Sequence, residues 1–249
     1  VITSPFGCVY TDSVFIDFHT DSITISPDTA ICPDQSATLR SSGGGSYFWN
    51  HGASLSSINI SNPVASPVTS TTYQLTVVTP NGCLLTDTVE VVVFVEPYSI
   101  SPDTTICLGD SAQLVATGGA NYVWDYQPSL SSTTISNPFA SPTLLTTYGV
   151  NIISTNGCIY RDSVEVSLYN DSYGVSNDTA ICFGDSVQVF AYGGISYNWA
   201  PMSVVSNPAQ SNSFVTPSVN TNLIVSMMTP NGCLVSDSVL VSVDRNFIN

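Results

Sequence analysis

Cysteines are the residues of this chain best suited to covalent chemistry, and they recur in strict register. A short interval such as Cys8 to Cys32 alternates with a long one such as Cys32 to Cys83 along the whole sequence. Cysteines in such register are typical of half-cystines in an oxidising compartment. A zinc site is the structural rival, but it needs local pairs such as C-x-x-C with ligating histidines, and the sequence has neither. The seven are Cys8, Cys32, Cys83, Cys107, Cys158, Cys182 and Cys233.

The cysteines belong to a sequence repeat, in which adding 75 to a residue number gives the equivalent position of the next unit. Trp49, Trp124 and Trp199 follow the same period, and each lies between two cysteines. A large aromatic residue at this fixed place is predicted to be a core residue of its unit rather than a sugar-stacking platform. The period predicts a C-terminal fragment of a preceding repeat at 1–21 and three full repeats at 22–96, 97–171 and 172–249.

Short alternating segments bounded by turn residues predict β-strands throughout each repeat. In the second repeat, Tyr148, Val150 and Ile152 alternate before an Asn156-Gly157 turn, which is typical of a tight hairpin. About seven short strands around a buried Trp indicate an all-β fold of Ig-like or PKD-like antiparallel sandwiches. The junction at 93–98 has no Gly/Ser spacer, so we expect a stiff, rod-like tandem array.

Two disulfide pairings fit the spacing. The within-repeat pairing joins cysteines such as Cys32 and Cys83, and the junction pairing joins cysteines of neighbouring repeats such as Cys83 and Cys107. Loop-closure entropy differs little between the two. A strand of about ten residues follows Cys83 and spans roughly 33 Å, which in a collinear array places Cys83 too far from Cys107 for a bond. We therefore predict bonds within repeats, although a folded-back junction would favour the other pairing. The predicted pairs are Cys32–Cys83, Cys107–Cys158 and Cys182–Cys233, with Cys8 left without a partner.

Composition excludes several classes of function. Acidic residues outnumber basic ones 18 to 3, so binding of nucleic acid is not expected. No apolar run approaches the roughly 18 residues needed to cross a bilayer, so direct membrane insertion is not expected either. The only histidines, His19 and His51, do not recur at the period, and nothing else suggests a catalytic group or a cofactor. The sequence predicts a protein that is not an enzyme.

The combined pattern of the repeat resembles a known class of domains. It reads Asp-Thr-x-Ile-Cys-x-Gly-Asp-Ser, then Gly-Gly, Tyr-x-Trp, Asn-Pro, Ser-Pro, Thr-Thr-Tyr, Asn-Gly-Cys and Asp-Ser-Val. This resembles the Ig-like and PKD-like tandem repeats of large Bacteroidota cell-surface proteins, including gliding-motility adhesins exported by the type IX pathway. The resemblance implies an extracellular, cell-surface location and no catalysis. The third repeat departs from the pattern, because Leu223 replaces the tyrosine of Thr-Thr-Tyr.

An Asp-Ser/Thr pair followed by a small or apolar residue occurs at ten places. It resembles the O-glycosylation signal of secreted Bacteroidota proteins, and sugars would help so weakly charged a surface to stay in solution. The alternative is that each Asp stabilises a turn or a strand end. The candidate hydroxyls are those of Ser13, Ser22, Thr29, Thr88, Thr104, Ser111, Ser163, Thr179, Ser186 and Ser238.

Carboxylates near the junctions are weak candidates for calcium, because a hard cation with oxygen ligands could stiffen an array. No dense Asp/Asn ligand loop is present, which favours ordinary solvated carboxylates and no bound metal. The candidates are Glu96, Asp103, Asp171 and Asp178.

The repeats predict a structural shaft of a surface filament or adhesin, active in adhesion or gliding motility. Its partners would be further copies of the repeat in a longer chain, with glycans or other surface ligands as possible targets. Two alternatives remain, an array of carbohydrate-binding modules and a self-assembling sheath. Exposed aromatic residues that do not follow the period, such as Tyr126, Tyr160 and Tyr192, are the better candidates for ligand contacts.

Overall fold

A computed structural model describes residues 1–245 of the chain. It divides into two compact units, one formed by 1–97 with 156–158, and the other by 98–155 with the residues from 159 onward. Strands and loops make up almost all of the described part, and its helices are two single 3-10 turns, η1 (Gly52–Ser54) and η2 (Met202–Val204). No helix in the described part is long and apolar enough to cross a bilayer.

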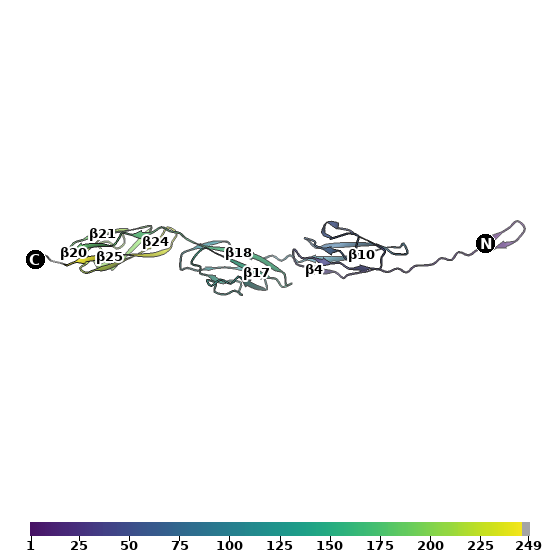
Figure 1. Ribbon diagram of the computed structural model, residues 1–249, viewed down its shortest axis with the longest axis horizontal. Coiled ribbons are helices and arrows are strands. Elements are labelled where there is room, and N and C mark those ends of the chain that lie inside the picture. Colours follow the sequence, from purple (N-terminus) through teal and green to yellow (C-terminus); the bar gives the residue numbers. More distant parts are fainter. Residues whose placement is uncertain (246–249) are drawn as a thin grey trace. The chain divides into compact units, whose positions relative to one another are not determined.

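The first unit contains one sandwich of two β-layers (Figure 1). One layer is a four-stranded sheet in the order β4 (Thr29–Ile31), β10 (Leu84–Val93), β9 (Thr71–Val78) and β7 (Ser46–Trp49). The other layer is formed by β3 (Thr24–Ile25) with β6 (Ser41–Ser42), and β5 (Ala37–Thr38) with β8 (Val64–Ala65). A separate hairpin, β1 (Ile2–Thr3) with β2 (Val9–Tyr10), precedes it, and residues 11–20 form no strand.

The second unit contains the same strand order twice. In the first of its sandwiches the four-stranded sheet is β12 (Thr104–Ile106), β18 (Ile159–Leu168), β17 (Thr146–Ile153) and β15 (Asn121–Trp124). The opposite layer pairs β11 (Ser99–Ile100) with β14 (Ala116–Thr117), and β13 (Ala112–Gln113) with β16 (Phe139–Ala140). In the second, the sheet is β20 (Thr179–Cys182), β25 (Leu234–Asp244), β24 (Thr221–Met228) and β22 (Ser196–Ala200), and the opposite layer is β19 (Gly174–Val175), β21 (Val187–Tyr192) and β23 (Asn212–Val215). The prediction of an all-β fold built from sandwiches is confirmed.

One detail of this topology decides where the first cysteine of each repeat lies. The short strand β4 runs parallel to the end of β10, with Ile31 opposite Val93, whereas β9 and β10 form an antiparallel hairpin. The same parallel pairing recurs between β12 and β18, and between β20 and β25. The cysteine at the end of each short strand therefore lies near the end of the last strand of its repeat.

The core of each sandwich follows from the alternation of its strands. In β9, Tyr73, Leu75 and Val77 are fully buried, because successive side chains of a strand point to opposite faces. Trp49 is 1% exposed, and its Nε1 donates to the carbonyl of Ile60 at 2.9 Å. The other periodic tryptophans are equally buried, at 2% for Trp124 and 0% for Trp199, so all three are core residues as predicted.

In the first two repeats a tyrosine hydroxyl of the four-stranded sheet is hydrogen-bonded to the turn that follows the tryptophan strand. Tyr73 is hydrogen-bonded to Ser54 at 2.7 Å, and Tyr148 to Ser129 at 2.6 Å. In the third repeat Leu223 takes this buried place and the residue one period after Ser129 is Val204. The polar pair is therefore replaced by an apolar pair, which explains how the departure from Thr-Thr-Tyr is tolerated.

Candidate functional site

The disulfides are the most distinctive chemical feature of the chain, and they differ from the predicted ones. Cys32 is bonded to Cys158, and Cys107 is bonded to Cys233, each with a Cα–Cα distance of 5.4 Å. Both bonds span 126 residues, so each reaches the hairpin of the following repeat instead of the hairpin of its own. The predicted pairs Cys32–Cys83, Cys107–Cys158 and Cys182–Cys233 are therefore wrong.

The parallel strand β4 explains the error. The backbone N–H of Phe94 donates to the carbonyl of Ile31 at 3.0 Å, so Cys32 lies beside the end of β10. Cys83 precedes the start of the same strand. At about 3.3 Å per residue the two cysteines of one repeat lie roughly 30 Å apart, far beyond disulfide reach. The strand length used to exclude the junction pairing thus excludes the within-repeat pairing as well.

The second cysteine of each repeat lies on a hairpin turn that is closed by its own backbone. At the first of these turns, the N–H of Thr79 donates to the carbonyl of Cys83 at 2.9 Å, and the N–H of Cys83 donates to the Thr79 hydroxyl at 3.1 Å. Gly82 has a φ of 84°, a left-handed conformation that favours glycine. The Asn-Gly of the sequence therefore fixes the backbone from which the cysteine side chain extends.

The acidic residue directly before the repeat binds this turn. Asp21 accepts hydrogen bonds from the Thr79 hydroxyl and from Nδ2 of Asn81, the latter at 2.8 Å. These two donors, Thr79 before Asn81, lower the pKa of the Asp21 carboxyl. We call this arrangement the acidic clamp. It fastens the hairpin to the incoming chain and so sets the place at which the second cysteine is presented.

The acidic clamp recurs in the other repeats. Asp171 accepts from the Thr229 hydroxyl at 2.5 Å and from Nδ2 of Asn231 at 2.7 Å, and Glu96 accepts from Asn156. Sequence reasoning missed this role, although residues 21, 96 and 171 are all acidic and differ by the period. That spacing was the available signal.

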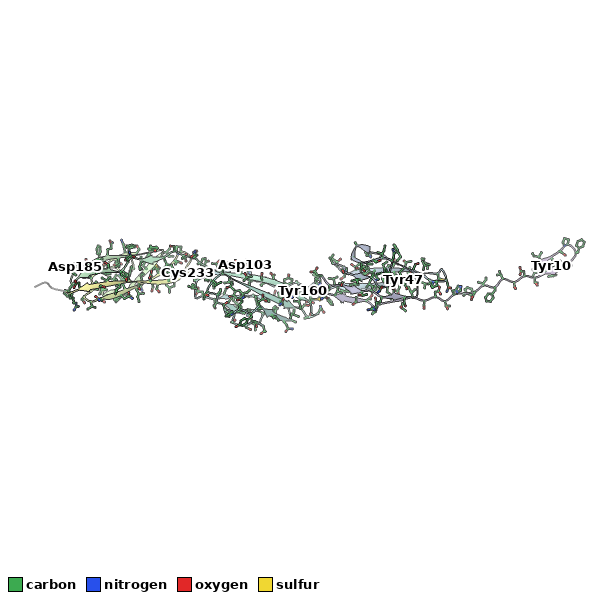
Figure 2. All side chains as sticks on the ribbon, viewed as in Figure 1. Tyr10, Tyr47, Asp103, Tyr160, Asp185 and Cys233 are labelled. Carbon is green, nitrogen blue, oxygen red and sulfur yellow. A yellow bond between two sulfur atoms is a disulfide. The ribbon has the colours of Figure 1, made fainter. Side chains whose placement is uncertain are left out.

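The first cysteine of each repeat opens a second recurring turn, at the opposite end of the sandwich from the hairpin. Figure 2 labels Asp185 at one end of the third sandwich and Cys233 at the other. The N–H of Asp185 donates to the carbonyl of Cys182 at 3.1 Å, and the equivalent bonds from Gln35 to Cys32 and from Asp110 to Cys107 have the same length. We call this the exit turn. Each repeat thus carries one cysteine at each end.

Three cysteines have no disulfide partner among the described residues. Cys8 is free, as predicted, but Cys83 and Cys182 are free as well. The bonded hairpin cysteines are buried, at 1% exposed for Cys158 and 5% for Cys233, whereas Cys83 is half-buried and Cys182 is exposed. A cavity of about 300 Å³ beside the Cys107–Cys233 bond is lined mainly by side chains of the two sandwiches that this bond joins.

The aspartates of the Asp-Ser/Thr motif have structural roles. Asp28 accepts from the N–H of Glu90 at 2.8 Å, which ties the residue before β4 to β10, and Asp103 and Asp178 do the same before β12 and β20 with Glu165 and Leu240. Thr104 and Thr179 of the candidate hydroxyls are half-buried, and the other eight are exposed. The structure brings none of them into one site. The exposed eight are Ser13, Ser22, Thr29, Thr88, Ser111, Ser163, Ser186 and Ser238.

The carboxylates considered for calcium do not form a cluster. Asp103 and Asp178 each bind a backbone N–H, while Glu96 and Asp171 belong to the acidic clamps. Within residues 1–245, no three His, Cys, Asp or Glu side chains lie close enough to hold a metal ion.

The aromatic residues considered for ligand contacts differ in their surroundings. Tyr160 stacks on Tyr98 with ring centroids 4.9 Å apart, so it is part of the packing of its own sandwich. Tyr126 is 81% exposed, and Tyr192 lies on the outer face of β21 with the exposed Phe190, while the exposed Phe214 lies opposite Gln188 on the same face. Tyr192 therefore lies on a strand face that carries two other exposed aromatic side chains.

Comparisons with known proteins give distant matches only. No family model matches the chain, and no curated protein is similar to it. Among solved structures, the eight N-terminal Ig domains of the Down syndrome cell adhesion molecule match with 13% identity over 89% of this chain and 35% of that chain, at a TM-score of 0.37. Cadherin domains 1–4 of protocadherin gamma B7 match with 11% identity over 90% and 76%, at 0.31, and the human desmocollin-1 ectodomain with 11% over 98% and 66%, at 0.28. Likenesses this weak carry no argument about function.

Proposed function

We propose that this chain forms part of the structural shaft of an extracellular surface filament or adhesin, of the kind used in adhesion and gliding motility. The observation that carries the proposal is the disulfide pattern, which adds to the main chain a second covalent link between each repeat and the next. Disulfides persist in oxidising compartments, which supports a secreted protein. The sequence resemblance to surface-protein repeats supports the cell surface as its location.

The disulfides shorten the covalent path through the repeats. Starting at Ser22, the path runs to Cys32, crosses the disulfide, and continues from Cys158 to Asn170. At about 3.6 Å per residue this route can extend to roughly 80 Å, although it connects the ends of two complete repeats. Without the bond the same ends are joined by the whole intervening chain, which extends to roughly 530 Å.

This route is short compared with the intervening chain. Tension between Ser22 and Asn170 would therefore pass into the Cys32–Cys158 bond once the route of roughly 80 Å is drawn out. The segments that carry the tryptophans, 32–83 and 107–158, lie outside this route and would be protected from unfolding by force. Such protection suits a shaft that must transmit load.

A pulling experiment on the full chain tests this proposal. Ser22 and Asn170 are both exposed, so each is replaced by an azide-bearing amino acid that carries a handle. The protein is then pulled between these two sites in optical tweezers. We expect a limit of roughly 80 Å in the oxidised protein and roughly 530 Å in the matched Cys32→Ser variant. A limit of roughly 165 Å, the value for bonds within repeats, would contradict the load path. Equal limits in the oxidised protein and the variant would contradict it too.

One observation favours carbohydrate binding as a second candidate. Phe190, Tyr192 and Phe214 are each about half exposed on the outer face of β21 and β23, and flat aromatic surfaces stack on sugars. The equivalent residues of the second repeat are Val115, Thr117 and Phe139, so the surface is not repeated. A glycan array probed with the full chain tests this candidate. Tight binding that is lost on Phe214→Ser would establish it, and no binding to any glycan would remove it.

A further inference from the structure

We propose that the three Asn-Gly hairpin turns are latent deamidation sites, which the acidic clamps keep unreactive. The turns are Asn81-Gly82, Asn156-Gly157 and Asn231-Gly232. Asparagine is a thermolabile residue, and before glycine no side chain hinders attack by the following backbone nitrogen. In each turn the asparagine donates its side-chain amide to the acidic residue of the clamp. Each clamp therefore holds the group that this reaction consumes.

The reaction is a cyclisation within the turn that is followed by hydrolysis. The backbone nitrogen of Gly82 loses its proton and attacks Cγ of Asn81. A bond forms between these two atoms, and the bond from Cγ to Nδ2 breaks as Nδ2 takes up a proton and leaves as ammonia. A water molecule then opens the cyclic succinimide at either carbonyl carbon, which gives aspartate or isoaspartate. Nothing is oxidised or reduced, and solvent water is the only co-reactant.

The clamp holds the nitrogen that has to leave. Nδ2 of Asn81 donates to Asp21 at 2.8 Å, and Nδ2 of Asn231 donates to Asp171 at 2.7 Å. Hydrogen bonds to an ionised carboxylate are stronger than neutral ones, and this bond must break before ammonia can depart. The hydrogen bonds from Thr79 and Asn81 lower the pKa of Asp21, so it is ionised at neutral pH and has no proton to give to the leaving group.

The backbone of the turn holds the attacking nitrogen as well. The N–H of Gly82 donates to the carbonyl of Thr79 at 2.9 Å, and the N–H of Gly232 donates to Thr229 at the same distance. This proton must be lost before the nitrogen can attack, so a second hydrogen bond has to break. All three asparagines are exposed, and water for the reaction therefore reaches them. Hydrogen bonds, and not burial, keep these turns unreactive.

Deamidation would open the clamp permanently. A carboxylate at position 81 has no N–H to donate, and it would face the like charge of Asp21. Isoaspartate would also add a methylene group to the main chain of the turn that ends at Cys83. In the next two repeats the same change would displace Cys158 and Cys233, which are bonded to the preceding repeat. The clamps thus protect the turns that carry the second cysteine of each repeat.

The test uses the full, oxidised chain with one clamp removed at a time. Asp21→Ser opens the first clamp and leaves the third intact, so Asn231 is the reference within the same molecule. Asp171→Ser exchanges the roles of Asn81 and Asn231. Each protein is incubated in mildly alkaline buffer. Mass spectrometry of its peptides and methylation by an isoaspartate-specific methyltransferase then report deamidation at each asparagine.

Two control variants separate the clamp from a general loosening of the repeat. Asp28→Ser removes a carboxylate of the same repeat that binds the N–H of Glu90 and lies outside the turn. Thr79→Val removes the hydroxyl bonds of the turn but leaves the bond from Asn81 to Asp21. Both controls should therefore keep deamidation at Asn81 as slow as in the unchanged chain.

We expect Asp21→Ser to raise the deamidation rate at Asn81 roughly tenfold and to leave the rate at Asn231 unchanged, because loss of a charge-assisted hydrogen bond frees the amide. Asp171→Ser should give the reverse result. An unchanged or slower rate at Asn81 in Asp21→Ser would overturn the proposal. An equal rise at Asn231, or at Asn81 in either control, would overturn it too, since loosening would then be the cause. The load path does not depend on this result, because every variant keeps the Cys32–Cys158 bond.

Discussion

Removing one disulfide should destabilise the chain by an amount that its sequence separation sets. The bond between Cys32 and Cys158 closes a loop of 126 residues. Loop-closure entropy assigns about 5 kcal/mol to a loop of this length. The Cys107–Cys233 bond has the same sequence separation. The variants Cys32→Ser/Cys158→Ser and Cys107→Ser/Cys233→Ser are therefore expected to lose the same stability, each relative to the oxidised chain.

Urea unfolding followed by tryptophan fluorescence measures this loss, because each repeat holds one buried tryptophan. With a urea dependence of about 2 kcal/mol per molar, a loss of about 5 kcal/mol lowers the midpoint by roughly 2.5 M. Cys83→Ser and Cys182→Ser are the matched controls, since both cysteines are free, and their midpoints should not move. Two results together would refute the reasoning. One is a loss of several kcal/mol of stability in Cys83→Ser. The other is a loss in Cys32→Ser/Cys158→Ser that is no larger than the loss in Cys32→Ser/Cys83→Ser.

Three further predictions concern single sites. Because folding lowers the pKa of Asp21, its clamp should be intact above the ordinary pKa of 3.8 and be lost as the pH falls through the lower pKa of the folded protein. An NMR titration of the Asn81 side-chain amide should show this transition, and Asp21→Asn should abolish the transition. Trp124→Ala should cost about 3–5 kcal/mol in urea unfolding, because it leaves a cavity and an unpaired carbonyl at Ile135, whereas substitution of the exposed Tyr126 should cost less than about 0.5 kcal/mol. Leu223→Tyr should destabilise the third repeat by about 1–3 kcal/mol by burying an unpaired hydroxyl, and addition of Val204→Ser should restore part of that loss; no recovery in the double variant would contradict the role given to the tyrosine–serine pair.

Most of the fold was predictable from sequence because its signals are local. Alternation in 71–78 and 84–93, the turn at Asn81 and Gly82, and the periodic tryptophans predict the hairpins and the core. The cysteine pairing was not predictable in this way. It depends on whether the short strand Thr29–Ile31 runs parallel or antiparallel to Leu84–Val93, and these two strands lie far apart in the sequence. So short a strand has no period that distinguishes the two directions.

The repeat itself also concealed the pairing. Because every cysteine recurs at the period, a bond within one repeat and a bond to the following repeat join the same two kinds of position. Spacing alone cannot separate these choices. The acidic clamp was more accessible, since a carboxylate at positions 21, 96 and 171 follows the period and each of the three binds the hairpin of the repeat that begins directly after it.

The most direct test of this account is a tryptic digest of the alkylated, denatured chain without reductant. The sequence has no lysine and three arginines, Arg40, Arg161 and Arg245, so trypsin yields the fragments 1–40, 41–161, 162–245 and a short end. With bonds from Cys32 to Cys158 and from Cys107 to Cys233, the three large fragments remain one covalent species that separates only on reduction. Release of 162–245 before reduction would show the within-repeat pairing, and release of 1–40 would show the junction pairing. Either result would contradict the claim that each disulfide links an exit turn to the hairpin of the following repeat.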